Sequence, residues 1–152
     1  MFNQLYPPVL ALHNAWRWVA LLGILFAAGL AFQGWLSRKP WTALSARSVS
    51  IGVIVMDVQL IIGLALYLGL SPLSRALFTD FTAAMQARET RFFGMEHSLL
   101  MVLAVGAVHF GKLSLRHQTR DGAKHRSIAL WYGASLLLML AGIPWWRPLL
   151  RH

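Results

Sequence analysis

Hydrophobic residues dominate four long stretches of the chain, at about residues 9–36, 44–70, 91–115 and 127–146. Each stretch is long enough to cross a bilayer, whose hydrocarbon core takes about 20 residues of α-helix. Apolar and polar residues do not alternate with a period of two over the length of a membrane β-strand. The pattern therefore predicts an all-α, polytopic membrane protein, with residues 1–152 forming one four-helix, up-down transmembrane bundle.

The connection between the second and third stretches has a helical pattern of its own. Ser71 and Pro72 have the composition of a helix start, with a capping serine followed by proline at the first helical position. Leu73, Leu77 and Phe81 then follow at helical spacing. The segment is predicted to form a short amphipathic helix in the membrane interface. A surface helix packed on the bundle fits the same pattern.

Composition strengthens the membrane assignment. Of the 152 residues, 57% are hydrophobic and only 12% are charged, far from the average of soluble proteins. The chain contains no cysteine. This excludes disulfides, thiolate metal sites, iron–sulfur clusters and the covalent attachment of a c-type haem.

The net charge of +9 indicates an orientation and not a nucleic-acid partner. No groove of interleaved basic and aromatic residues is predicted, so no nucleic acid is expected to bind. Most basic residues lie in the first and third connections, and the positive-inside rule places these on the cytoplasmic side with both termini opposite. The basic residues of that side are Arg38, Lys39, Arg47, Lys112, Arg116, Arg120, Lys124 and Arg126.

Ionisable and polar residues interrupt the predicted spans at similar depths. Charged side chains inside a bilayer are costly and commonly mark a functional site or a pair. With a rise of 1.5 Å per residue, Arg17 on the first span and Glu96 on the third reach nearly the same level. They are predicted to form an ion pair within a buried polar cluster of Arg17, Asp57 and Glu96. In a plainer interpretation, the pair only holds the two spans together.

Two histidines, His13 and His97, carry the sharpest chemical hypothesis. Facing histidines on two membrane helices can provide both axial ligands of a b-type haem. The predicted haem site is completed by Arg17 and Arg91, which would face the propionates, and by Tyr67. Two other interpretations stay open: His13 caps the first span together with Asn14, and His97 forms a hydrogen bond with a neighbouring carboxylate.

Other chemistries have weaker support in the sequence. His13, His97, Asp57 and Glu96 form a mixed set that suits iron, manganese or zinc, although no compact metal-binding spacing is present. Asp57, with Gln59 nearby, is a candidate for a proton or quinone site in the membrane. No nucleophile–base pair or phosphate-binding loop is present, so no catalytic residues and no independent catalytic activity are predicted.

Several motifs resemble a family of small bacterial four-helix integral membrane proteins that are labelled as cytochrome b-like. The motifs are HNAWRW at 13–18, QLIIGLALY at 59–67, RFFGMEH at 91–97, KHR at 124–126 and LAGIPWW at 140–146. The resemblance covers nearly the whole chain. It implies the four-span fold, a location in the bacterial inner membrane, and a haem for which His13 and His97 match the histidines of spans one and three.

The leading hypothesis is therefore a membrane electron-transfer protein or subunit with one haem b between the first and third helices. The alternative is a non-catalytic accessory subunit of a larger respiratory or photosynthetic complex. Its expected partners are the lipid bilayer and either other subunits of such a complex or further copies of itself, with quinone as a further candidate.

Overall fold

The structure, a computed structural model, describes residues 2–147 and is helical throughout, with no strand in that range. Its α-helices are α1 (Phe2–Leu36), α2 (Ala43–Ala65), α3 (Pro72–Thr79), α4 (Phe81–Gln86), α5 (Arg88–Arg91), α6 (His97–Ser114) and α7 (Asp121–Gly142). Two π-helical segments, η1 (Leu66–Leu70) and η2 (Phe92–Glu96), extend α2 and precede α6, and a 3₁₀ turn, η3 (Leu115–His117), follows α6. The all-α prediction is confirmed.

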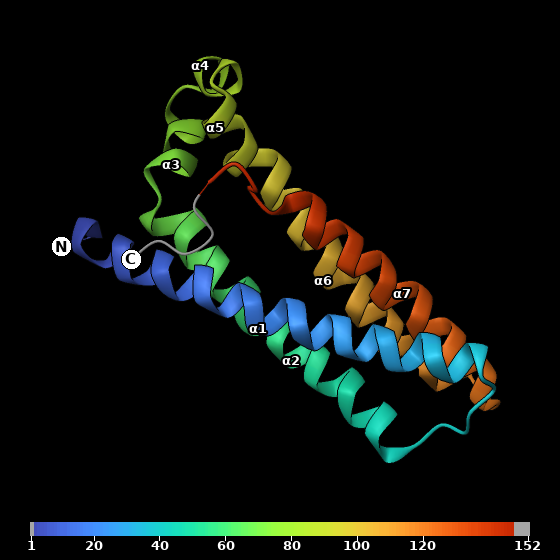
Figure 1. The fold of residues 1–152 in the computed structure, drawn as a ribbon. Helices are drawn as coiled ribbons and strands as arrows, with labels where there is room; N and C mark the ends of the chain where they lie inside the picture. The colour runs from blue at the N-terminus through green and yellow to red at the C-terminus, as the bar shows by residue number, and fades with distance from the viewer. Residues whose placement is uncertain (1, 148–152) are drawn as a thin grey trace.

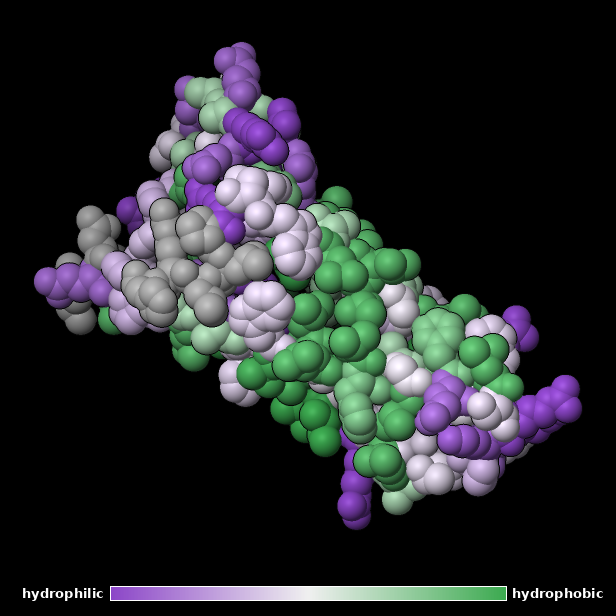
Figure 2. All heavy atoms as spheres, viewed as in Figure 1, coloured by the Kyte–Doolittle hydropathy of each residue, from purple (hydrophilic) through white to green (hydrophobic). Residues whose placement is uncertain are grey.

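Three helical stretches are long and apolar enough to cross a membrane: Gln4–Leu36, Ala43–Leu70 and Arg88–His117. Large apolar side chains remain exposed on their outer faces, among them Leu22 on α1, Ile61 on α2 and Leu99 on α6. Figure 2 shows the same property as a hydrophobic band across the middle of the molecule, with hydrophilic residues gathered at the two ends. Such an apolar surface would be unfavourable in contact with water, so we interpret the protein as a membrane protein.

The long helices form an elongated bundle (Figure 1). α7 packs against α6 and α1, and α2 packs against α1 and α6. The short helices α3, α4 and α5 gather at one end, which also holds the first residues of α1 and the end of α7 (Figure 1). The other end holds the α1–α2 connection and the turn between α6 and α7. The two ends therefore differ in structure as well as in charge.

Small residues on α1 allow the close approach of its neighbours. Ala20, Ala27 and Ala31 are each at most 3% exposed and lie on one face of α1, in line with the fully buried Ile24. Opposite them, the fully buried Tyr132 of α7 donates a hydrogen bond of 2.7 Å to the carbonyl of Val49 on α2. Aligned small residues and one satisfied hydroxyl thus link three helices in the core.

Helix starts agree with the sequence signals, with one correction. The Ser71 hydroxyl accepts a hydrogen bond of 3.2 Å from the Leu73 amide, with Pro72 at the first helical position, as predicted. The expected single amphipathic helix is instead two short helices. Asp80 has extended backbone and accepts from the Ala83 amide at 3.0 Å, so it ends α3 and begins α4. Aspartate favours this capping role over a position inside a helix.

Two helix ends differ from the ends of the predicted spans. α1 begins at Phe2 and not near residue 9, because its first turns extend beyond the apolar stretch, with Gln4 and Leu5 exposed. α7 ends at Gly142 and not near residue 146. Pro144 explains this early end, since a proline disfavours helical backbone in the residue before it, and Ile143 is extended.

Candidate functional site

The structure brings the rings of His13 and His97 together inside the bundle. The ring centroids are 6.2 Å apart and the ring planes make an angle of 71°. His13 lies in α1 and His97 is the first residue of α6, so the contact joins helices far apart in the sequence. The two histidines that the sequence singled out therefore share one site.

His97 is oriented by the break at the end of α7. Its Nδ1 lies 2.7 Å from the carbonyl oxygen of Gly142. The last carbonyls of a helix have no partner within the helix, and Pro144 prevents α7 from continuing to supply one. Nδ1 therefore carries the proton and donates a hydrogen bond to the Gly142 carbonyl. This leaves the lone pair of Nε2 available for a ligand.

His13 is held by α2. The side-chain amide of Gln59 lies 3.3 Å from Nε2 of His13 and donates to its backbone carbonyl at 3.2 Å. The ring lies against Gly63, where a Cβ atom would come within 3.3 Å of Cε1. The other ring nitrogen, Nδ1, is buried and has no hydrogen-bond partner within residues 2–147. The Gln59 amide nitrogen can only donate, so Nε2 of His13 accepts from it and the buried Nδ1 carries the proton of the ring.

Aromatic rings cover the outer side of His97. Phe92 and Phe93, in the segment that precedes it, have ring centroids 6.0 and 5.9 Å from the imidazole. Trp146, beyond the end of α7, lies edge-on to Phe92 at 4.5 Å. Arg147 lies 4.6 Å from the centroid of Phe93 and forms an ion pair of 2.6 Å with Glu89. This cover separates the imidazole pair from the polar end of the bundle.

Tyr67 connects the two π-helical segments that flank the site. Its hydroxyl donates a hydrogen bond of 2.8 Å to the carbonyl of Gly94, so η1 and η2 are joined at one level. π-helical turns are rare and are often found at functional sites. Tyr67 was predicted to bind a cofactor. In the structure it positions the backbone that leads into His97.

The predicted buried cluster of Arg17, Asp57 and Glu96 is not formed. Glu96 forms its ion pair with Arg91 at 2.9 Å, and both side chains are over 40% exposed. Arg17 is buried, at 9% exposed, and its guanidinium lies 5.4 Å from the centroid of Trp18. The physical reason is the π-helical turn: it brings residues five apart together, whereas an α-helix would separate them. Arg91, and not the predicted Arg17, is thus the ion-pair partner of Glu96.

Asp57 lies on another face of the bundle and pairs with His109. Its Oδ1 lies 2.7 Å from Nε2 of His109, and the two side chains are 41% and 51% exposed. The pair joins α2 to α6 near the middle of the second apolar stretch. Asp57 therefore belongs to a second polar site, distinct from His13 and His97.

Removing either partner of this second pair is expected to have unequal effects in a bilayer. His109→Ala leaves the Asp57 carboxylate alone inside a span and is expected to destabilise the protein by about 2 kcal/mol. Asp57→Asn is expected to cost less, because the asparagine carbonyl can still accept a hydrogen bond from His109 and no carboxylate is left alone in the span. Unfolding by SDS in mixed micelles, followed by circular dichroism, measures both. Equal losses, or a larger loss for Asp57→Asn, would contradict the interpretation.

The structure also decides between the open interpretations of the histidines. His13 does not cap its helix, because α1 begins well before it at Phe2. His97 bonds to the Gly142 carbonyl and not to a carboxylate. Within residues 2–147, no group of three or more histidine, aspartate and glutamate residues is placed to hold a metal ion. The mixed His/carboxylate site is therefore not assembled there.

Sequence reasoning missed the groups that position the two histidines: Gln59, Gly63, Gly142 and the aromatic cover of Phe92 and Trp146. The only available signal was the Gly-Ile-Pro sequence at 142–144, which marks a helix end with free carbonyls. No family model, no curated protein and no solved structure matches the chain. The cytochrome b-like resemblance therefore stays a prediction.

Proposed function

We propose that the protein is a membrane electron carrier that binds one b-type haem between His13 of α1 and His97 of α6. The observation that carries the proposal is the pair of imidazole rings whose centroids are 6.2 Å apart. An imidazole nitrogen binds a transition metal at about 2 Å. The two rings lie close enough that one iron would be held between them.

The donor chemistry of the site fits a haem better than a bare metal ion. Two neutral imidazoles and no thiolate or third ligand are typical of an iron whose remaining positions are filled by a porphyrin. The Gly142 carbonyl leaves Nε2 of His97 unprotonated, with its lone pair available. The lone pair of His13 lies on Nε2 and accepts from the Gln59 amide, so iron at that ring would replace this hydrogen bond.

Each neighbouring residue has a distinct part in this proposal. When bound, the haem supplies reversible transfer of one electron. Gly142 holds the imidazole of His97 through its unligated nitrogen, as partners of metal-ligating histidines do, and Gln59 holds the backbone carbonyl of His13. Phe92 and Phe93 exclude water from the imidazoles. Arg17, one turn after His13, would provide positive charge for the carboxylates of a haem, whereas the charge of Arg91 is paired with Glu96.

The proposal includes a membrane topology. α7 has 22 residues and packs along α6 and α1, so we propose that it is the fourth span. The basic connections then face the cytoplasm of a bacterial inner membrane, and both termini lie on the opposite side. The apolar outer surface faces lipid, further copies of the chain or other subunits of a membrane complex.

An absorbance spectrum of the detergent-purified protein, produced with an adequate haem supply, tests the proposal. A sharp Soret band, a reduced-minus-oxidised α band and one haem b per chain by pyridine haemochromogen are expected. A folded, colourless protein that also fails to take up added haemin would overturn the proposal. If that colourless protein co-purifies with a larger respiratory or photosynthetic complex, the accessory-subunit hypothesis takes its place.

A further inference from the structure

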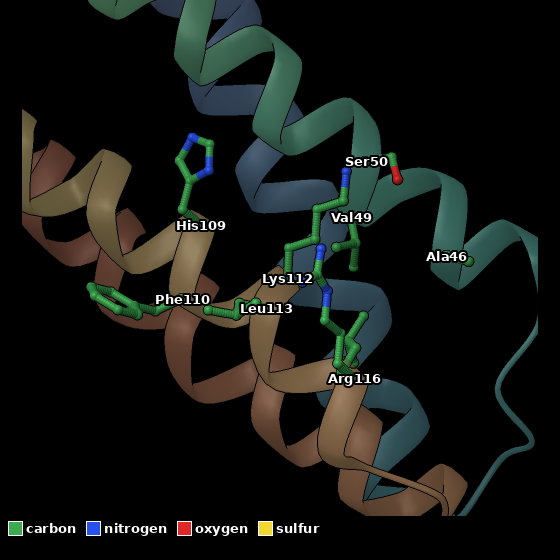
Figure 3. Close-up of a pocket in the computed structure, with 9 residues that line it drawn as sticks. Ala46, Val49, Ser50, His109, Phe110, Lys112, Leu113 and Arg116 are labelled. Atoms are coloured by element: carbon green, nitrogen blue, oxygen red, sulfur yellow. The ribbon is translucent and has the colours of Figure 1, made fainter.

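A surface groove lies in the half of the bundle opposite the imidazole pair. Between α2 and α6, a groove of about 490 Å³ opens at the molecular surface, at the end where the basic connections lie (Figure 3). Its polar lining comes from Ser50 of α2, from His109 and Lys112 of α6, and from Arg116 of η3. Val49 and Leu113 are among its apolar walls. The groove therefore combines cations with a hydrophobic surface.

The two cations converge because of helix geometry. Lys112 and Arg116 are four residues apart and lie on one face where α6 ends. Figure 3 shows both side chains extending from α6 toward α2 and Ser50. No acidic residue lines the groove, and neither cation takes part in an ion pair within residues 2–147. His109, which also lines the groove, is paired with the carboxylate of Asp57. Charge complementarity therefore favours an anion.

The position of the groove narrows the class of anion. Lys112 and Arg116 mark the end of an apolar stretch long enough to span a membrane, which is the level of lipid headgroups. The groove lies beside exposed apolar residues of the same helices, such as Ile54 and Phe110. A soluble anion would gain nothing from these walls, and a zwitterionic headgroup brings its own positive charge. Basic pockets between membrane helices are typical sites for acidic lipids.

We propose that this groove binds an anionic phospholipid, with its phosphate between Lys112 and Arg116 and an acyl chain along Phe110 and Leu113. Ser50 donates a hydrogen bond to the headgroup. The site is independent of the haem proposal, and depends only on α2 and α6 lying in a membrane. It gives the basic end of the protein a preference for acidic lipid.

The absence of cysteine allows one reporter to be placed in the groove. Ala46 lines it, and an Ala46→Cys variant can be labelled with bimane and reconstituted in phosphatidylcholine vesicles at 0.1 M salt. Brominated phosphatidylglycerol is expected to quench the label as strongly as about a tenfold higher mole fraction of brominated phosphatidylcholine. Lys112→Gln/Arg116→Gln is expected to abolish that preference. Inorganic phosphate at the same ionic strength is expected to leave it unchanged.

The matched control removes the same charge at the same end of the bundle but outside the groove. Arg38→Gln/Arg120→Gln changes two exposed residues in the connections and is expected to keep the tenfold preference. Circular dichroism verifies that each variant is folded. Equal quenching by both lipids in the unsubstituted groove would overturn the proposal. So would a preference that survives Lys112→Gln/Arg116→Gln, one that the control also abolishes, or displacement by inorganic phosphate.

Discussion

His97→Ala and His13→Ala are each expected to lower haem occupancy by more than about tenfold, since even residues that only support a metal ligand change affinity by 10–100-fold. Either substitution removes one of the two rings that face each other at 6.2 Å. Haem content per chain, measured by pyridine haemochromogen after purification, gives the result. The helical content by circular dichroism is expected to stay close to that of the unsubstituted protein. The helices are held together by their apolar core, to which the two imidazoles do not belong.

The matched control for these variants is His117→Ala. His117 lies in the 3₁₀ turn after α6, is exposed, and is at the other end of the bundle. Its removal is expected to leave the haem content unchanged. Full haem content in His97→Ala would exclude this residue as a ligand, and an equal loss in His117→Ala would show that the effect is not specific to the imidazole pair.

Gly34→Ala is expected to destabilise the basic end of the bundle by about 1–3 kcal/mol, the usual cost of overpacking. A Cβ atom at this position would overlap the ring of His125 on α7. The ring has little freedom to move away. It is 2% exposed, its Nε2 lies 3.3 Å from the Pro40 carbonyl, and its centroid is 4.8 Å from that of Trp41. Thermal unfolding in detergent, followed by circular dichroism, measures the loss.

Gly29 provides the comparison on the same helix. A Cβ atom there meets nothing within 4 Å, so Gly29→Ala is expected to be neutral or to stabilise α1 by up to about 1 kcal/mol, because alanine favours helix over glycine. The difference between the two variants isolates the contact with His125. Equal stability of Gly34→Ala and Gly29→Ala would show that the ring yields to the added methyl group.

The helical architecture could be predicted from the sequence because it depends on patterns that act locally. Long apolar stretches predict spans, and Ser71 followed by Pro72 predicted the start of α3 correctly. The end of α7 was placed too late because hydrophobicity continues through Trp145 and Trp146, whereas backbone geometry stops the helix before Pro144. Local steric rules override hydrophobic length at such points.

The site was predictable only in part, because depth alone does not give direction. His13 and His97 were paired from the ligand chemistry of facing histidines, although depth arithmetic set them about one turn apart, and the structure places their rings 6.2 Å apart. The same arithmetic assigned Arg17 to Glu96 and failed, since it assumed α-helical geometry across the π-helical segment before His97. The partners of Asp57 and His97 depend on how helices rotate against one another, which no single span reveals.

The central claim is that two nearly perpendicular imidazoles bind one iron, and a low-temperature EPR spectrum of the oxidised, haem-loaded protein tests it most directly. If both imidazoles hold the iron of the haem, one low-spin ferric signal is predicted. This signal is expected to persist in His109→Ala and to disappear in His97→Ala. A high-spin ferric signal in the unsubstituted protein, or a low-spin signal that survives His97→Ala, would contradict the account.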